Sequence, residues 1–338
     1  RNDDEYTSIY RIPVDGGESL KVISHKNNIG SFTLNADGDT LVFVAKPAKD
    51  KSKEKLTKKG FKAEIYEEDI QFNHAYQVNL DNLEEKPVQL DIDAHVLSAQ
   101  FHPGKDHLLL RTTPTPHIDD NYTASEYGIY RLNGERIQAF KTEGKLGEAE
   151  WSTDGKYVAM IGAEDKHDPA DGRLFVARSS NGKMTEYVKD YAGHIKAIEW
   201  LSDNQLAFLG HVGTGSEVSV IDLKSNQVDN KLPLGKAVLR GFDVSQDGKT
   251  MVATIGRANH PREVYAVNRG ELKRLTHSNP WLENIAMPKQ ESIKYTARDG
   301  LELEGILVYP VDYKKNQRYP LIMMVHGGPE AHISNEWL

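Results

Sequence analysis

The sequence has no cysteine in 338 residues. This absence excludes disulfide bonds, a thiolate nucleophile and thiolate metal ligands. Long apolar runs are also missing: the longest, residues 321–325, has the length of a strand, whereas a membrane-spanning helix needs roughly 20 apolar residues. The chain begins at Arg1 without an initiator methionine or a basic and apolar leader, so any targeting segment is expected upstream of it. We therefore predict no membrane span, and the compartment, cytoplasmic or periplasmic, stays open.

Several motifs of catalysis are absent as well. The sequence holds no Gly-x-Ser-x-Gly nucleophile elbow, no His-Glu-x-x-His metal-binding helix and no Gly-x-x-x-x-Gly-Lys phosphate loop. Acidic residues outnumber basic ones and give a formal net charge of -8, which disfavours nucleic acid as a main partner. With 38% hydrophobic and 27% charged residues, the composition is that of a folded globular protein. We predict a globular chain that needs no metal and no cofactor.

A repeat of an aromatic residue followed by a tight-turn dipeptide runs through the first 277 residues. A strand-like run follows each turn. Asp-Gly between apolar-patterned runs favours a hairpin, because both residues tolerate a positive φ in a type I′ turn. The aromatic positions are Phe32, Phe101, Trp151, Trp200 and Phe242, with turns at residues 37–38, 103–104, 154–155, 203–204 and 247–248, and strand-like runs at 40–45, 107–112, 157–161, 205–209 and 250–255.

A second hairpin follows each of these runs, so a unit of roughly 45 residues predicts four strands, as in a β-propeller blade. Five units are complete, and residues 7–14 and 19–23 are typical of the last two strands of a sixth. We predict a mainly β fold, a β-propeller with about five and a half blades visible over residues 1–278 and incomplete at its N-terminus. An all-β sandwich would not explain the in-phase repetition, and no Trp-Asp dipeptide ends a strand as in the WD type of propeller.

One long insert, residues 46–73, separates the second and third strands of the first complete unit. Its lysine-rich first half predicts a solvated loop with a short helix. Its second half carries two adjacent acidic residues, Glu67 and Glu68. Over a propeller mouth, these carboxylates would pair with the protonated α-amine of a peptide, because charge-assisted hydrogen bonds are strong in a partly desolvated cleft. The alternative is an acidic loop that only faces water.

The repeat ends near residue 278, and residues 279–338 follow a different pattern. Strand-like runs at 291–295 and 303–309 flank an Asp-Gly turn, and a further strand is predicted at 321–325. Two or three strands that lead into a glycine-rich loop are typical of the opening of an α/β sheet. We predict that residues 279–338 are a linker and the start of an α/β-hydrolase domain, incomplete at its C-terminus.

The glycine-rich loop consists of His326, Gly327, Gly328 and Pro329, directly after the last predicted strand. An oxyanion hole needs a backbone N–H that points at the substrate with no Cβ in the way, which favours consecutive glycines. The position after an apolar strand is the context that this motif requires. We predict an oxyanion donor at Gly327 or Gly328, with His326 as a structural hydrogen-bonding residue of the loop.

These residues resemble the junction between propeller and hydrolase in the prolyl oligopeptidase family of serine peptidases, and most closely its acylaminoacyl-peptidase and bacterial dipeptidyl-peptidase-like branch. The likeness covers the whole chain, and the junction is its specific part. It implies a propeller, usually seven-bladed, that caps an α/β-hydrolase and gates the access of peptides to a Ser-Asp-His triad. The matching stretches are Thr296-Ala297-Arg298-Asp299-Gly300, Leu303-Glu304-Gly305-Ile306-Leu307, Pro310, Tyr319-Pro320 and His326-Gly327-Gly328-Pro329.

The resemblance also implies roles for particular residues. Gly328 is a stronger candidate than Gly327 for the oxyanion donor, and Glu67 with Glu68 is similar to the double-Glu motif with which dipeptidyl peptidases hold a free N-terminus. The triad lies downstream in chain order and is missing here, so the chain alone is predicted to be inactive. The function predicted for the intact protein is hydrolysis of short peptides through an acyl-enzyme, with peptides as partners and self-association left open. A non-catalytic binding propeller and an esterase-type hydrolase are the alternatives.

Overall fold

The computed structural model describes residues 6–48, 50–63, 65, 67–68, 70–167, 170, 172–233 (backbone only at 230–233), 237–245, 247–268, 271–328 and 331–338. Pro329 of the predicted oxyanion loop lies outside these residues. The chain divides into two compact units. Unit 1 comprises Arg1–Leu146, Asp154–Val158 and Ala177–Met184, and unit 2 comprises Gly147–Thr153, Ala159–Val176 and Thr185–Leu338. The boundary predicted after residue 278 stays a prediction.

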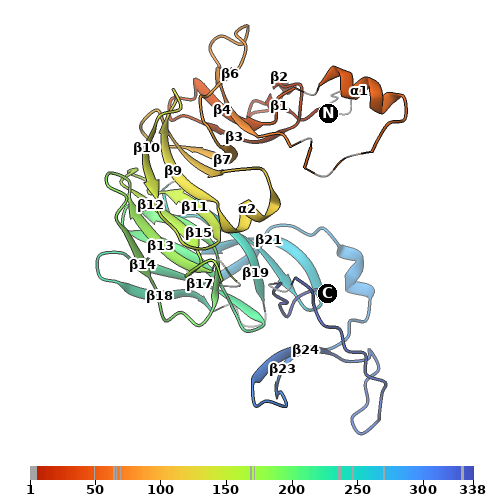
Figure 1. The fold of residues 1–338 in the computed structure, drawn as a ribbon. Coiled ribbons are helices and arrows are strands. Elements are labelled where there is room, and N and C mark those ends of the chain that lie inside the picture. The colour runs from red at the N-terminus through yellow and green to blue at the C-terminus, as the bar shows by residue number, and fades with distance from the viewer. Residues whose placement is uncertain are drawn as a thin grey trace. The chain divides into compact units, whose positions relative to one another are not determined.

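The fold is mainly β and consists of antiparallel sheets whose strands are neighbours in chain order (Figure 1). The described residues form five four-stranded sheets, and their strands lie at the positions that the repeat predicts. In chain order the sheets are β3 (Ile29–Leu34), β4 (Thr40–Ala45), β5 (His74–Asn79) and β6 (Val88–Gln89); β7 (His95–Phe101), β8 (His107–Thr113), β9 (Glu126–Arg131) and β10 (Arg136–Phe140); β11 (Leu146–Trp151), β12 (Tyr157–Gly162), β13 (Arg173–Arg178) and β14 (Met184–Tyr187); β15 (His194–Ser202), β16 (Gln205–Val212), β17 (Gly215–Asp222) and β18 (Gln227–Pro233); and β19 (Val238–Val244), β20 (Met251–Arg257), β21 (His260–Asn268) and β22 (Glu271–Arg274).

Two further pairs of strands and three short helical segments complete the described elements. The strand pairs are β1 (Ser8–Arg11) with β2 (Leu20–Ser24), and β23 (Gln290–Thr296) with β24 (Glu302–Val308). The helical segments are α1 (Lys51–Lys58), α2 (Ile118–Thr123) and η1 (Pro280–Asn284). α1 is the short helix predicted in the insert. None of the helices in the described ranges has the length and apolarity to cross a membrane.

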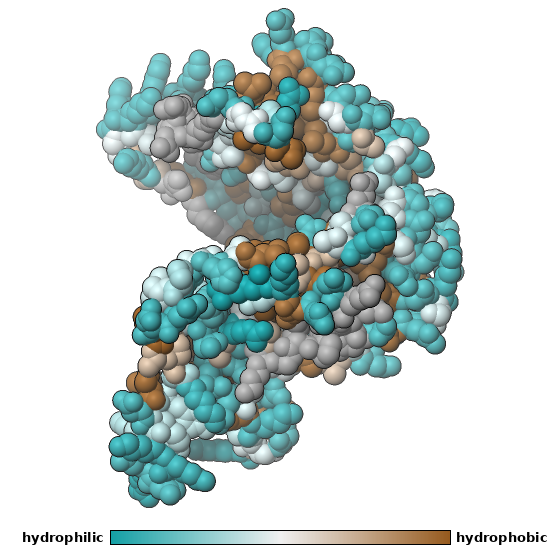
Figure 2. Space-filling view, turned by 180° about the vertical axis from the view of Figure 1, so that it is seen from behind, coloured by the Kyte–Doolittle hydropathy of each residue, from teal (hydrophilic) through white to brown (hydrophobic). Residues whose placement is uncertain are grey.

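The core lies between successive sheets within each unit. Five of the six residues of β4 are buried, because both faces of the strand are covered, and the strand is therefore apolar throughout rather than alternating. Phe43 of β4 packs in a cluster with residues of β1 and β2, whereas Val42 packs in a cluster with residues of β7 and β8. In unit 2, Leu209 of β16 and Leu239 of β19 share a cluster in the same way. On the face shown in Figure 2, hydrophilic residues cover most of the surface.

The aromatic residues of the repeat are buried, with one exception. Phe101, Trp151, Trp200 and Phe242 are buried, with 6–9% of their surface exposed, whereas Phe32 is 54% exposed. Each of these residues lies on the first strand of its sheet. Phe32 lies on β3, and the sheet that precedes β3 in the described chain has two strands rather than four.

The hairpin turns differ from the predicted type I′. In such a turn both central residues have a positive φ, but in the Asp-Gly turns only the glycine does: φ is 74° at Gly38, 69° at Gly155 and 70° at Gly248. Gly38 N donates to Asn35 O over 3.1 Å, and Gly248 N donates to Ser245 O over 2.7 Å. These are four-residue turns followed by a left-handed glycine, which suits a loop longer than two residues. The hairpins were predicted correctly and the turn type was wrong.

The strand predicted at residues 321–325 is absent. These residues have no regular secondary structure, and their apolar side chains, from Leu321 to Val325, are 80–91% exposed. A strand needs a hydrogen-bonded neighbour to satisfy its backbone groups, and β23 and β24 pair with each other. The apolar pattern predicted a strand from side-chain character alone, without a neighbour to bond to it.

Candidate functional site

The glycine loop follows the β23–β24 hairpin in unit 2. His326 is exposed, and its Nδ1 lies 3.2 Å from the carbonyl oxygen of Gly327. Gly328 has φ 138°, a conformation that residues with a Cβ rarely adopt. A Cβ added to Gly327 would meet nothing within 4 Å. The loop therefore requires glycine at 328 for its backbone path and leaves open space beside 327, so a ligand has access to the backbone there.

Glu67 and Glu68 are both exposed and lie in a turn of unit 1. Glu67 has φ 65°, which is uncommon for a residue with a side chain and stores some strain. Its Oε1 lies 3.4 Å from His117 Nδ1, with 51% and 36% of the two side chains exposed. An exposed pair of this kind contributes at most about 1 kcal/mol, so His117 does not prevent Glu67 from binding another cation. The acidic pair belongs to unit 1 and the glycine loop to unit 2.

Four carboxylates on the first strands of three successive sheets form a cluster that sequence reasoning missed. They are Glu148 and Glu150 on β11, Glu199 on β15 and Asp243 on β19, all within unit 2. Burial, reinforced by Glu199, Glu148 and Asp243, raises the pKa of Glu150 to about 9. Burial, with Asp243 and Glu148 adding to it, raises the pKa of Glu199 to about 7. Glu150 is therefore protonated at neutral pH.

The repeat itself held the signal for two of these acids, because each directly precedes a Trp of the repeat: Glu150 before Trp151 and Glu199 before Trp200. A residue at the same position in successive sequence repeats lies at the same position in successive sheets. Within the described residues, no group of three or more His, Asp or Glu side chains is arranged to hold a metal ion.

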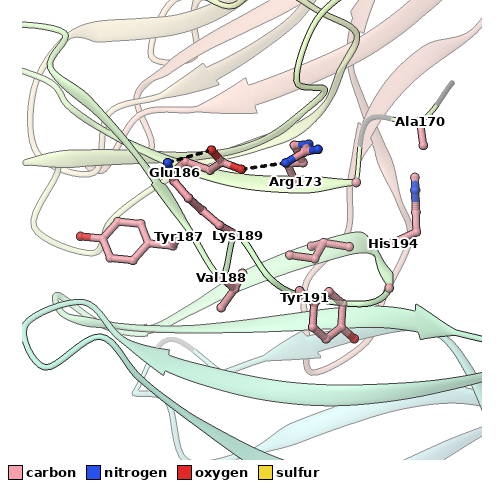
Figure 3. A pocket seen from close by; sticks show the side chains of 11 residues that line it. Ala170, Arg173, Glu186, Tyr187, Val188, Lys189, Tyr191 and His194 are labelled. Carbon is pink, nitrogen blue, oxygen red and sulfur yellow. Dashed lines mark hydrogen bonds and ion pairs between the residues drawn. The ribbon is translucent and has the colours of Figure 1, made fainter. Parts of the chain in front are cut away.

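A pocket of about 210 Å³ lies in unit 2 beside the start of β15. Figure 3 shows Glu186 between Arg173 and Lys189, with ion-pair distances of 3.1 and 3.5 Å. The Tyr191 hydroxyl donates to Glu217 over 2.9 Å, and burial followed by this bond raises the pKa of Tyr191. The charged groups of the pocket are paired with one another. This arrangement holds the pocket wall together.

Glycines make room for Tyr191 in this pocket. A Cβ on Gly193 would lie 2.7 Å from the Tyr191 ring, and one on Gly210 would overlap the Tyr191 hydroxyl. Both glycines belong to Gly-His pairs in the sequence, which in this structure serve packing.

Val188 has φ 49°, a strained conformation for a β-branched residue.

No family model matches the sequence. Dipeptidyl-peptidase 5 of Porphyromonas gingivalis is 28% identical over 225 residues, which cover 64% of this chain and 32% of that protein. The structure of acylaminoacyl peptidase from Pyrococcus horikoshii matches with a TM-score of 0.74 at 18% identity, over 98% of this chain and 51% of that one. Puromycin hydrolase matches with a TM-score of 0.65 at 16% identity, over 92% and 47%.

These relatives support the predicted likeness to the prolyl oligopeptidase family. The chain spans about a third of the length of the curated relative and about half of the solved acylaminoacyl peptidase. The solved acylaminoacyl peptidase and puromycin hydrolase share this fold over nearly all of these residues, which agrees with a propeller-like architecture.

Proposed function

We propose that this chain is the propeller and the first hydrolase strands of a serine peptidase that cleaves short peptides through an acyl-enzyme. The propeller, residues 1–278, has seven blades in the full-length protein and gates access to the site. Residues 279–338 begin the hydrolase domain, and the Ser-Asp-His triad follows residue 338. The observation that carries the proposal is the β23–β24 hairpin followed by a loop in which the backbone requires Gly328, in a chain whose relatives are peptidases.

The role of the loop follows from the chemistry of acyl transfer. Attack of a serine on the scissile carbonyl places a negative charge on its oxygen, and a fixed backbone N–H stabilises that charge without reorganising. Residues 326–328 are exposed. Gly328 has a positive φ, and because glycine has no side chain, nothing of this residue covers the backbone at the turn. We assign the donor to Gly328, with Gly327 as the neighbour whose missing Cβ keeps the approach open.

The acidic pair extends the proposal to the substrate. We propose that Glu67 and Glu68 hold the free α-amine of a peptide, as in dipeptidyl peptidases. Their exposure and the weak ion pair with His117 leave both carboxylates able to bind a cation. Holding the amine would then determine how many residues from the N-terminus the peptide is cut.

A fluorophosphonate probe tests the proposed reaction class. We expect the full-length gene product to be labelled at one serine and the 338-residue chain to stay unlabelled under the same conditions. Labelling of the 338-residue chain at a serine would overturn the assignment of the triad to residues after 338. Absence of labelling in a folded full-length protein would favour a binding propeller over a peptidase.

A further inference from the structure

The segment that follows the glycine loop is bonded to the β16–β17 hairpin. His332 Nε2 donates to Gly213 O over 2.7 Å, and Asn335 N donates to Thr214 O over 2.7 Å. The His332 ring stacks on His211 of β16, with centroids 4.6 Å apart and planes inclined by 23°. Two backbone-directed hydrogen bonds and a ring stack therefore hold residues 332–335 on this hairpin.

The same segment carries one buried carboxylate. Glu336 is 4% exposed, and it accepts hydrogen bonds from Arg240 Nε over 2.7 Å and from Arg262 Nη2 over 3.2 Å. Arg240 lies on β19 and Arg262 on β21. A buried charge persists only when it is paired and hydrogen-bonded, and two guanidinium groups meet that need.

The middle strand of this sheet leaves space for the carboxylate. A Cβ on Gly256 of β20 would lie 2.6 Å from Glu336 Oε2, which is too close for two atoms that are not bonded. Three adjacent strands thus form one cradle: β19 and β21 each supply an arginine, and β20 supplies a glycine. The two arginines and the missing Cβ of Gly256 together accommodate the Glu336 side chain.

The hairpin that precedes the loop is attached to the same segment. Gln290 Nε2 of β23 donates to Asn335 Oδ1 over 2.9 Å and to Glu336 O over 2.8 Å. Asn335 Nδ2 donates to Ser292 Oγ over 3.3 Å. The chain before the loop and the chain after it are therefore tied together and to the fourth and fifth sheets, all within unit 2.

We propose that Glu336, held by Arg240 and Arg262, is a positioning residue that sets the Gly327-Gly328 loop in place from the propeller side. Glu336 follows Gly328 by eight residues in the chain, so an anchor at Glu336 limits where the loop can lie. The fourth and fifth sheets are then a scaffold for the oxyanion donor as well as part of a gate. This inference rests on the proposed peptidase function.

The first arm of the test measures catalysis by the full-length protein carrying Glu336→Ala, Glu336→Gln or Arg240→Ala. We expect Glu336→Ala to lower kcat by roughly tenfold or more, because a misplacement of about 1 Å costs up to a hundredfold in rate, with KM changed much less. Glu336→Gln keeps an acceptor for the arginines and should recover part of kcat. Lys249→Ala, which removes an exposed cation from the turn between β19 and β20, should leave kcat unchanged.

The second arm needs no activity and measures amide hydrogen exchange in the 338-residue chain. We expect Glu336→Ala to speed exchange in residues 332–336, where the amides of Asn335 and Glu336 are hydrogen-bonded, and to leave β11–β14 unchanged. If kcat per titrated active site stays at the wild-type value while only the melting temperature falls, the anchor is merely structural and the inference is wrong. If the full-length protein never reacts with the fluorophosphonate probe, the proposed function fails, and unchanged exchange in Glu336→Ala would separately refute the anchor.

Discussion

The indole N–H of Trp200 donates to the backbone carbonyl of Glu150 over 3.3 Å, which bonds the first strand of one sheet to the first strand of the sheet before it. The two residues belong to β15 and β11. An aromatic residue recurs at this position of the repeat, and at Trp200 its place between two sheets gives a physical reason for it.

Replacing Trp200 tests this contact. Trp200→Phe should lower the free energy of unfolding by about 1 kcal/mol, because the hydrogen bond is lost, and Trp200→Ala should cost about 3–5 kcal/mol, because a cavity forms. Urea denaturation measures both. Phe32→Ala is the matched control, since Phe32 is 54% exposed, and it should cost less than about 1 kcal/mol. Equal costs at the two positions would contradict the contact between sheets.

A second prediction concerns the loop. Gly328→Ala should slow peptide hydrolysis by the full-length protein by roughly a hundredfold or more, as expected when an oxyanion donor is displaced, because φ 138° strains any residue with a Cβ. The measurement is kcat on a chromogenic peptide. Gly327→Ala is the control: its Cβ would meet nothing within 4 Å, and its effect should be smaller. The reverse order would move the donor to Gly327.

A third prediction separates substrate classes. Glu67→Ala and Glu68→Ala should each raise KM for peptides with a free N-terminus by roughly tenfold, since a charge-assisted hydrogen bond contributes about 1.5–3 kcal/mol. Peptides with an acylated N-terminus carry no amine charge and should be hydrolysed as before. Glu84→Ala, at an exposed acid in another turn of unit 1, should change neither. If acylated peptides lose as much activity as free ones, the pair does not bind an amine.

A fourth prediction concerns pH. The pKa of Glu150 is about 9 in the folded chain, against a reference value of 4.5 for the unfolded chain. The contribution of Glu150 to the free energy of unfolding is therefore fully present below pH 4.5 and is lost as the pH rises through 9. Glu150→Gln should therefore stabilise the chain by several kcal/mol at pH 9 and have much less effect near pH 5. Melting temperatures at both pH values measure this difference. A destabilised variant at pH 9 would show that the buried acid is ionised and paired.

The same titration has an opposing contribution from His211. Burial, followed by His332, Arg240, His194 and Lys196, lowers the pKa of His211 to about 4 from 6.5. Stability linked to His211 is complete above pH 6.5 and is lost as pH falls through 4. The two contributions oppose each other between pH 4.5 and 6.5, so together they predict a stability maximum in this mildly acidic range.

Periodic features of the fold were predictable from the sequence, and contacts between distant segments were not. β4 begins and ends at the predicted residues, and the insert lies between β4 and β5 as expected. A hairpin depends on the local order of apolar and turn residues, which the sequence shows directly. The cradle of Glu336 joins residues 96 and 74 positions apart in the chain. Neither arginine has a repeat counterpart that would reveal it, so the carboxylate and its partners become visible only in the fold.

The predicted roles of Gly327, Gly328, Glu67 and Glu68 stay predictions. The structure adds the reason for glycine at 328 and the weak ion pair of Glu67. The strand predicted at 321–325 fails for a physical reason: hydrophobicity marks a segment that favours a strand, but pairing requires a second segment.

The exposed run from Leu321 to Val325 has a consequence for handling the protein. Five consecutive apolar residues without a charge, 80–91% exposed and outside any sheet, are the kind of segment that adds to the same segment of another molecule as a cross-β stack. A chain ending at residue 338 therefore has a built-in nucleus for self-aggregation, and a single lysine placed in this run would act as a gatekeeper against it.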